Sequence, residues 1–480
     1  MDKFIDFSSN TGLLIRRSWL LLITAVKIGD LETSTRSIVK KLPNGKKSCQ
    51  SISQTGGILN MPAKTLHTLL YEWHVSQRAN MARFGDYLMP MWYPTGAKYE
   101  HLAVLAGSGL FDTSHMAAVQ IKGPNALEFL QHCVTKDLLH CIGKSKKPLQ
   151  PGCCTYGAFL NTQGGIVDEA IIFQIDTDTY ILILNAGMGA IVSQHLSRLQ
   201  ENYQVKVTNL TGRFGKLDLQ GPYSAKILKG LLKNPSAVFD RMPYFTFKGT
   251  GGLMPGPSSA ELIDNTPLMV SRTGYTGEFG FELFVAPEDL IKVWTMILDA
   301  GQVIPCGLAA RDSLRAGAVL PLAHQDIGSW PFINHPWPFS LPFNEDKSGF
   351  TKTFIGDKAL LKVSPPQYTY PFVGYDLRKV SVSGDTAVFD SSGKKTGIVL
   401  TCVTDMGIGW VGDRIYSVAS PDKPQDFEPK GLCCGFILVR EPLDYGQTVE
   451  LQDQRRSIKV LVVKDIRPDR SARRPLSEFL

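Results

Sequence analysis

Two segments of the chain place charged side chains on elements that the sequence predicts to be rigid. Residues 271–282 form a glycine-rich turn that leads into an apolar strand carrying Glu282. Glycine allows the tight, positive-φ backbone that such a turn needs. Residues 306–315 open a helix that carries Arg311. A carboxylate accepts directional hydrogen bonds and a guanidinium forms charge-assisted pairs, so together they suit an anionic ligand with an amide-like edge.

The elements that must position these groups show an internal repeat. Residues 119–126 and 216–223 each read as an alternating strand, a Gly-Pro break and the start of a helix. Another short apolar strand, 180–184, ends at Asn185. Two related strand–turn–helix units predict a pseudo-duplicated α+β body.

The remaining pattern divides the chain into three parts. After Phe350, short alternating segments and turns replace helical periodicity, which is typical of a β-barrel or jelly-roll domain. We therefore expect an N-terminal extension over 1–60, a body over 61–345, and a C-terminal β domain with a basic tail over 346–480. Within the body we expect an amphipathic helix over 66–73, a packing helix over 290–298, a surface loop over 249–259 and a proline-rich linker over 336–342.

Composition narrows the class of protein. The chain has 480 residues, of which 43% are hydrophobic and 20% charged, as is usual for a soluble globular protein. The net charge of +7 is too dispersed to indicate nucleic-acid binding, although it favours acidic partners. The nine cysteines form no disulfide framework. His132–Cys133 and His140–Cys141 do not have the spacing of a standard zinc site, so no metal is expected.

The first 60 residues differ from the rest. They hold nine Lys or Arg against four Asp or Glu, and an apolar run at 19–26 that is too short to span a bilayer, which needs ~20 residues. The basic, serine-rich character predicts a mitochondrial targeting leader and a matrix location, although transit peptides are poor in acidic residues. A secretory signal and a disordered extension are the alternatives.

Eight short motifs, in order, resemble the aminomethyltransferase (T-protein) family of the glycine cleavage system. Together with 271–282 and 306–315 they cover 68–361 well and the C-terminal part more loosely. The motifs lie at 71–75, 84–85, 89–93, 100–104, 110–116, 164–169, 219–222 and 354–360.

The resemblance implies a three-domain GcvT-type cloverleaf around a central folate cavity. It also implies transfer of an aminomethyl group from the lipoyl arm of H-protein to tetrahydrofolate. Ammonia and 5,10-methylenetetrahydrofolate would be released, with no metal. Tetrahydrofolate would be a co-substrate and lipoylated H-protein the macromolecular partner.

The family's folate-binding residues match four positions here: Met116, Asn185, Glu282 and Arg311. A carboxylate can accept from the N–H edge of a pterin, and arginine can pair with carboxylates or carbonyls of folate. Structural roles are the alternatives: His115 in a buried turn and Met116 as core filler. Asp312 is expected to be an internal partner of Arg315 or a charge at the N-terminus of the helix rather than a catalyst. Glu282 is hardest to explain structurally, because an unpaired buried carboxylate is costly.

One departure from the family concerns the catalytic carboxylate. The family usually carries Asp-Asp where this chain has Asp168-Glu169, and the second residue is the catalytic one, which makes Glu169 the candidate. Strand alternation should point Asp168 to the opposite face. Glu169 reaches about one methylene further than aspartate, and a ~1 Å misplacement can cost about 10²-fold in rate. Phe343 and Ala323 also replace usual aromatic positions, a tryptophan in the first case.

These departures leave a second reading open. A catalytically weakened family member would bind folate and act in assembly or as a scaffold, although the Lys-Gly-Cys-Tyr context of the iron–sulfur-assembly relatives is missing. A folate-dependent demethylating oxidoreductase would need a fused flavin-binding domain, and no Gly-x-Gly-x-x-Gly segment follows a strand here.

Overall fold

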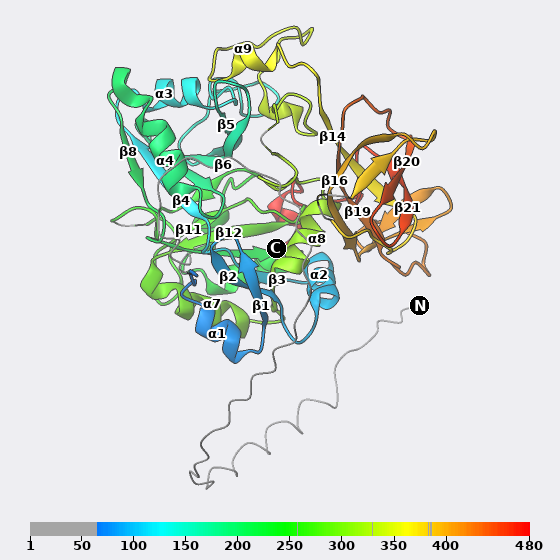
Figure 1. Cartoon of the computed structure of the whole chain (residues 1–480). Coiled ribbons are helices and arrows are strands. Elements are labelled where there is room, and N and C mark those ends of the chain that lie inside the picture. Colours follow the sequence, from blue (N-terminus) through cyan, green and yellow to red (C-terminus); the bar gives the residue numbers. More distant parts are fainter. Residues whose placement is uncertain (1–64, 257, 329, 383, 385) are drawn as a thin grey trace, which may run out of the picture. The chain divides into compact units, whose positions relative to one another are not determined.

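The computed structural model describes residues 65–480 except 257, 329, 383 and 385. The predicted N-terminal extension therefore lies outside the described residues. The body contains two antiparallel-rich sheets (Figure 1). The first has, in spatial order, strands β10 (Phe247–Lys248), β11 (Leu268–Ser271), β12 (Gly280–Val285), β9 (Gly215–Gln220), β3 (Gly109–Asp112) and β13 (Ile304–Cys306). The second has β5 (Cys154–Leu160), β6 (Ile166–Gln174), β7 (Thr179–Leu184), β4 (Ala117–Lys122) and β8 (Lys206–Asn209).

Helices cover the outer faces of both sheets. The α-helices of the described part are α1 (Tyr71–Ser76), α2 (Ala97–Ala106), α3 (Ala126–Cys133), α4 (Gly189–Ser197), α5 (Ser224–Leu231), α6 (Pro235–Phe239), α7 (Leu290–Asp299), α8 (Leu308–Gly317) and α9 (Asp357–Leu360). Short 3₁₀ turns lie at Gln200–Asn202, Pro287–Asp289, Pro338–Ser340 and Leu476–Glu478. One core packs α5 and α7 against the six-stranded sheet, and another packs α3 and α4 against the five-stranded sheet.

The two sheets meet face to face through a third apolar cluster. Phe173 of β6 and Ile181 of β7 meet Met269 of β11 and Phe284 of β12, and the Phe173 and Phe284 rings lie 5.9 Å apart. Because side chains alternate along a strand, every second residue of β6, β9 and β12 points into this inter-sheet layer. The polar residues that share these positions therefore face one another between the sheets.

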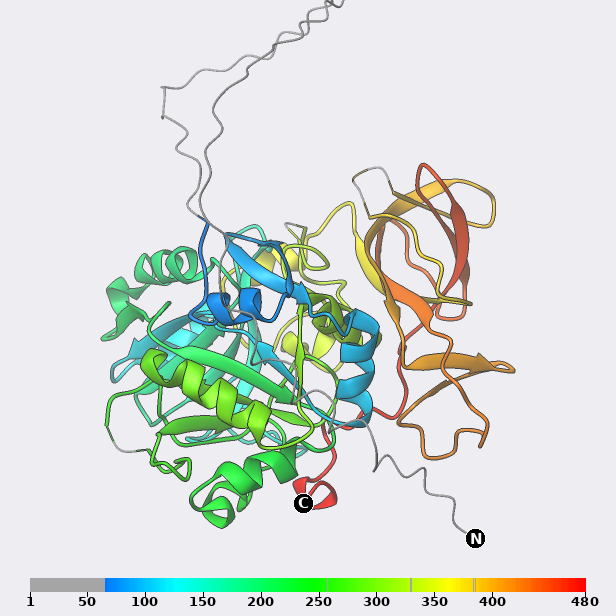
Figure 2. The same ribbon diagram turned by 90° about the horizontal axis from the view of Figure 1, so that it is seen from below.

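The C-terminal part forms a closed six-stranded barrel (Figures 1 and 2). Its strands, in order around the barrel, are β14 (Tyr368–Gly374), β19 (Leu432–Val439), β16 (Lys395–Asp405), β15 (Ala387–Phe389), β20 (Thr448–Gln452) and β21 (Ser457–Val462). Two hairpins stand outside the larger sheets: β1 (Asn80–Phe84) with β2 (Tyr87–Trp92), and β17 (Ile408–Val411) with β18 (Arg414–Ser417). Of the two alternatives for this domain, the barrel is confirmed.

Residues beyond the barrel return to the body. The Arg272 guanidinium donates to the backbone carbonyl of Ala472 at 3.1 Å, and the rings of Phe279 and Phe479 stack 3.9 Å apart. Arg467 is fully buried rather than free in a solvated tail. Segments that precede the barrel strands in the sequence and segments that follow them therefore both pack in the body.

The α+β class and both strand–turn–helix units are confirmed, whereas some local expectations are wrong. Leu66 does not lie in a helix; it bridges Tyr87, and α1 begins only at Tyr71. Leu66 and Leu69 are exposed, so of the apolar residues before Tyr71 that suggested the longer helix only Leu70 packs into the core. In the segment 249–259, Leu253 is buried, so this is not simply a surface loop. Within the described residues, no helix is long and apolar enough to cross a membrane.

Candidate functional site

A buried ion network lies on the inter-sheet face of the six-stranded sheet. Lys216 and Asp218 are alternate residues of β9, and β12 places Glu282 directly opposite Asp218. The Lys216 ammonium lies 2.5 Å from a carboxylate oxygen of Asp218 and 2.6 Å from one of Glu282. The Thr273 hydroxyl donates to the second oxygen of Glu282 at 2.5 Å. Glu282 is therefore paired, which corrects the expectation of a buried carboxylate with no structural partner.

Arg311 joins the same network from α8. Its Nη1 donates to Asp218 at 2.7 Å, and its guanidinium lies 5.0 Å from the centre of the Tyr275 ring. The charge-assisted pair expected with a ligand is thus made with Asp218. Burial raises the pKa of Asp218, but the charges of Lys216 and Arg311 more than offset this, so that its pKa is lower than usual. Two carboxylates and two cations leave the cluster close to neutral.

Lys216 and Asp218 were not among the residues predicted from sequence. The strand that contains them was predicted, and its alternation of charged and apolar residues was visible. In an amphipathic strand such charges usually face solvent, whereas here both side chains are fully buried between two sheets. The alternating charges were visible in the sequence, but that they are buried follows only from the five-stranded sheet that packs against this strand.

Glu169 lies on the inter-sheet face of the five-stranded sheet. The hydroxyl of Tyr156, on the neighbouring strand β5, donates a short hydrogen bond to its carboxylate. The Trp337 ring packs edge-on against Tyr156 with ring centres 4.7 Å apart, so the proline-rich segment forms part of this wall. Burial raises the pKa of Glu169 to about 8, and the neighbouring charge of Asp168 acts in the same direction. Glu169 is therefore a carboxyl group able to exchange a proton near neutral pH.

Asp168 and Asn185 meet where β6 begins and β7 ends. Asp168 accepts from the side-chain amide of Asn185 at 2.8 Å and from its backbone N–H at 3.2 Å. The Asn185 side chain also lies close enough to Glu169 to lower the pKa of that carboxyl group. The Nε2 atom of His324 lies 3.5 Å from Asp168. The sequence-predicted pair Asn185 and Glu169 is therefore brought together.

Tyr275 lies between the Glu169 group and the Arg311 group. Burial is the largest cause of its raised pKa, and the charges of Glu169 and Arg311 both act on it. Its hydroxyl donates to the carbonyl of Pro321 at 2.6 Å. The two sets of predicted site residues thus belong to one electrostatically connected region.

Met116 and His115 follow β3 at the same layer. Met116 packs against the inter-sheet cluster and is only partly buried. His115 is 4% exposed, and its Nδ1 atom has no hydrogen-bond partner among the described residues. Burial lowers the pKa of His115 to about 4, which keeps the ring neutral. A buried polar atom without a partner is costly unless something binds there.

Two further clusters are structural. His101 contacts Ser313 at 2.8 Å and Asp405 at 2.9 Å, which resembles a hydrolytic triad, but Asp405 is also paired with the buried Arg467 at 2.5 Å. These contacts fasten the barrel to the body.

Arg315 donates to Asp312 at 2.8 Å, which confirms the internal partnership expected for Asp312. No group of three or more potential metal ligands occurs among the described residues.

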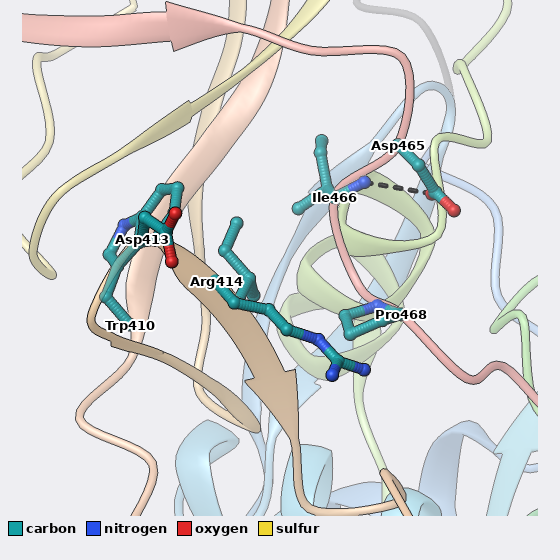
Figure 3. Close-up of a pocket in the computed structure, with 7 residues that line it drawn as sticks. Trp410, Asp413, Arg414, Asp465, Ile466 and Pro468 are labelled. Atoms are coloured by element: carbon teal, nitrogen blue, oxygen red, sulfur yellow. Dashed lines mark hydrogen bonds between the residues drawn. The ribbon is translucent and has the colours of Figure 1, made fainter. Parts of the chain in front are cut away.

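Two surface hollows lie away from these groups. One of about 540 Å³ lies beside the β17–β18 hairpin and is lined by Trp410, Asp413, Arg414, Ile415, Asp465, Ile466 and Pro468 (Figure 3). Another, of about 500 Å³, is lined by Arg241, Lys248 and the start of the 249–259 segment. Neither is lined by any of the five predicted site residues. The predicted folate-site residues Glu169 and Glu282 lie instead on strand faces between the two sheets.

Comparison with known proteins identifies the family. Residues 70–330 match the family model described as the GCVT N-terminal domain. An aminomethyltransferase from Desulforamulus reducens is 32% identical over 354 residues, which cover 72% of this chain and 89% of that protein. The chain belongs to the GcvT family.

Other relatives agree with this assignment. An aminomethyltransferase from Thermus thermophilus is 34% identical to this GcvT-family chain over 61% of it and 76% of the relative. The crystal structure of glycine cleavage system aminomethyltransferase T from Bartonella henselae superposes with a TM-score of 0.65. That match has 24% identity and covers 83% of this chain and 97% of the other, so it confirms the GcvT fold.

Proposed function

We propose that this GcvT-family protein is the aminomethyltransferase of a glycine cleavage system. It would transfer the aminomethyl carbon from the lipoyl arm of H-protein to tetrahydrofolate. Ammonia and 5,10-methylenetetrahydrofolate would leave, and the lipoyl arm would remain as a dithiol. The relatives named aminomethyltransferase support this proposal, and so does a buried, proton-exchanging carboxyl group at Glu169.

The side chains between the sheets fit a reduced folate. Glu282 offers carboxylate oxygens to the N–H edge of a pterin, while Lys216 and Thr273 hold that carboxylate in place. Because the Lys216, Asp218, Glu282 and Arg311 cluster is close to neutral, it can give directional hydrogen bonds without demanding a strongly charged ligand. The unpartnered Nδ1 of the buried His115 supplies a further polar atom. Met116, Asn185 and Arg311 would complete the folate contacts.

Glu169 would serve the chemical step. The protonated aminomethyl thioether would transfer its carbon to the two folate nitrogens and release neutral ammonia, while one folate N–H proton passes to the sulfur and the other to Glu169. An ionised Glu169 would stabilise positive charge at the transferred carbon and accept a proton. With a pKa of about 8, the same group can hold that proton afterwards. Tyr156 and Asn185 keep the carboxylate oriented.

The observation that carries the proposal is the burial of Glu169 against Tyr156 in the inter-sheet layer. Its test is single-turnover formation of methylenetetrahydrofolate from aminomethyl-loaded H-protein and tetrahydrofolate, with Glu169→Asp measured alongside. Turnover by the wild type at a rate that Glu169→Asp barely improves supports the proposal. A wild type that binds folate without turnover, but gains activity as Glu169→Asp, favours the weakened folate-binding member that acts in assembly or as a scaffold.

A further inference from the structure

A strained loop follows α8 and carries His324. Val319 has φ of 57° and His324 has φ of 62°, both in the left-handed region. For a β-branched residue this conformation is a true outlier, and for histidine it is uncommon. Such strain persists only where surrounding contacts determine the backbone, and it concentrates at functional sites.

Hydrogen bonds and an ion pair hold this loop in place. The backbone N–H of Leu322 donates to Asp326 at 2.9 Å, and that carboxylate is also bound by Arg315. The Thr401 hydroxyl of the barrel donates to Asp326 at 2.6 Å. The backbone N–H of His324 donates to the carbonyl of Ile327 at 2.7 Å. The loop is therefore fixed by the body and the barrel together, with the His324 side chain projecting from it.

That side chain is aimed at Asp168. The Nε2–Oδ1 distance of 3.5 Å is short enough for an ion pair but long for a hydrogen bond. Asp168 is fully buried, and among the described residues neither Lys nor Arg lies within ion-pair distance of it. The imidazole of His324 is about half-exposed and can take up a proton from solvent. The protonated imidazole of His324 can therefore supply the positive charge that pairs with Asp168.

The other titratable side chains near the His324–Asp168 pair already have partners of their own. Glu169 bonds to Tyr156, and Asp326 bonds to Arg315. Tyr275 is a further titratable neighbour, and the charge of Glu169 helps to raise its pKa. An imidazolium at His324 thus meets one carboxylate directly, and a chain of contacts runs from that carboxylate to the Asn185 amide and from this amide to Glu169.

We propose that His324 is a positioning residue of the transfer site: as an imidazolium it pairs with Asp168, which fixes the Asn185 amide and through it the Glu169 carboxylate. This inference rests on the proposed function. It links the strained loop to the site, because the left-handed backbone at His324 carries the imidazole that lies 3.5 Å from Asp168. The interaction with Asp168 raises the pKa of His324, so the pair is complete at low pH and is lost as pH rises through that raised value.

The pair itself is tested without any transfer reaction. We would follow the His324 ring signals by NMR across pH in the full chain and in Asp168→Asn. The expected result is a pKa above 6.5 in the wild type that falls in Asp168→Asn. An unchanged titration in Asp168→Asn would overturn the pairing.

The positioning role is tested with His324→Asn, which tolerates the left-handed backbone and does not titrate. His324→Lys keeps a positive charge across the pH range. In the wild type we expect the affinity for tetrahydrofolate and kcat/KM for transfer to fall on the alkaline side. His324→Asn should lower kcat/KM on the order of 10-fold at pH 7 and lose this alkaline fall, whereas His324→Lys should retain activity at higher pH.

Lys347→Asn is the matched control, because Lys347 has a similar φ of 58° on an exposed loop. Its pH profile should equal that of the wild type. A wild-type profile in His324→Asn, with the fold intact by thermal denaturation, would overturn the inference. If the wild type performs no transfer, the proposed function fails, and the pH dependence of folate affinity in His324→Asn still decides the role of His324.

Discussion

Tyr156 donates its hydroxyl hydrogen to the carboxylate of Glu169 across the β5–β6 pair. Both side chains are buried and lie on the face that meets the other sheet. The hydrogen bond favours the ionised carboxylate, whereas burial and Asp168 favour the neutral form, which leaves the pKa of Glu169 near 8. A carboxyl group set between these opposing effects can change its protonation during a reaction at neutral pH.

Replacing Glu169 with glutamine keeps the shape of the side chain and removes its charge. We expect Glu169→Gln to lose transfer activity by at least about 10²-fold, because neither charge stabilisation nor proton transfer remains. Affinity for tetrahydrofolate should stay within a few fold. Single-turnover kinetics and equilibrium binding measure the two effects, and the exposed Glu201→Gln is the control. A transferase that tolerates Glu169→Gln would contradict the assigned role.

Removing the Tyr156 hydroxyl should shift the pH dependence of the reaction. Because that hydroxyl lowers the pKa of Glu169, Tyr156→Phe should raise the pKa above about 8. If the ionised carboxylate is the active form, the acid limb of the kcat/KM profile moves to higher pH in Tyr156→Phe, whereas the alkaline limb assigned to His324 stays in place. A kcat/KM profile between pH 6 and 10 measures this shift. No shift would mean that the ionisation belongs to another group.

The ion network under the predicted pterin site should be important for stability. Lys216→Met leaves the carboxylates of Asp218 and Glu282 buried without their shared cation, which we expect to cost about 3–5 kcal/mol of unfolding free energy. The control is Lys233→Met, which breaks an exposed pair with Glu261 at 2.9 Å. It should cost less than about 1 kcal/mol. Urea denaturation compares the two, and equal losses would show that the buried network adds no special stability.

His115 makes stability depend on pH in the acid range. Its folded pKa of about 4 lies below the ordinary value of 6.5, so the unfolded chain binds the proton more readily. The contribution of neutral His115 to the free energy of unfolding is therefore complete above pH 6.5. It is lost as pH falls to 4, which lowers that free energy by about 3 kcal/mol. Denaturation curves at pH 7 and 4.5 should show a smaller difference in His115→Phe than in the wild type. The exposed His67→Phe should leave the difference unchanged.

The sequence predicted those features that depend on local pattern. Strand alternation and the Gly-Pro breaks located β4 with α3 and β9 with α5, because both signals lie within a few residues. The boundary of α1 was missed because the residues before Tyr71 form an irregular segment, in which Leu66 bridges β2 and both Leu66 and Leu69 are exposed. Apolar spacing over a few residues does not show which of them are buried or where a helix begins.

The partners of the site residues could not be predicted. Lys216 and Glu282 are 66 residues apart and meet because β9 and β12 pair. His324 reaches Asp168 only through a left-handed backbone that no sequence pattern specifies for histidine. The resemblance supplied the candidates Met116, Asn185, Glu282 and Arg311, but Lys216 and Asp218, which pair with Glu282 and Arg311, emerged only from the fold. Charges buried by a second sheet look, in sequence, like charges on a solvated strand.

The return of the chain to the body after the barrel has a consequence during synthesis. Phe479 belongs to the apolar core of the six-stranded sheet, and it is translated after every barrel strand. Domains usually fold as they leave the ribosome, N-terminal first. Here the barrel can close while the older part of the chain still lacks a piece of its core. The nascent body therefore stays incompletely packed until Phe479 has emerged from the exit tunnel.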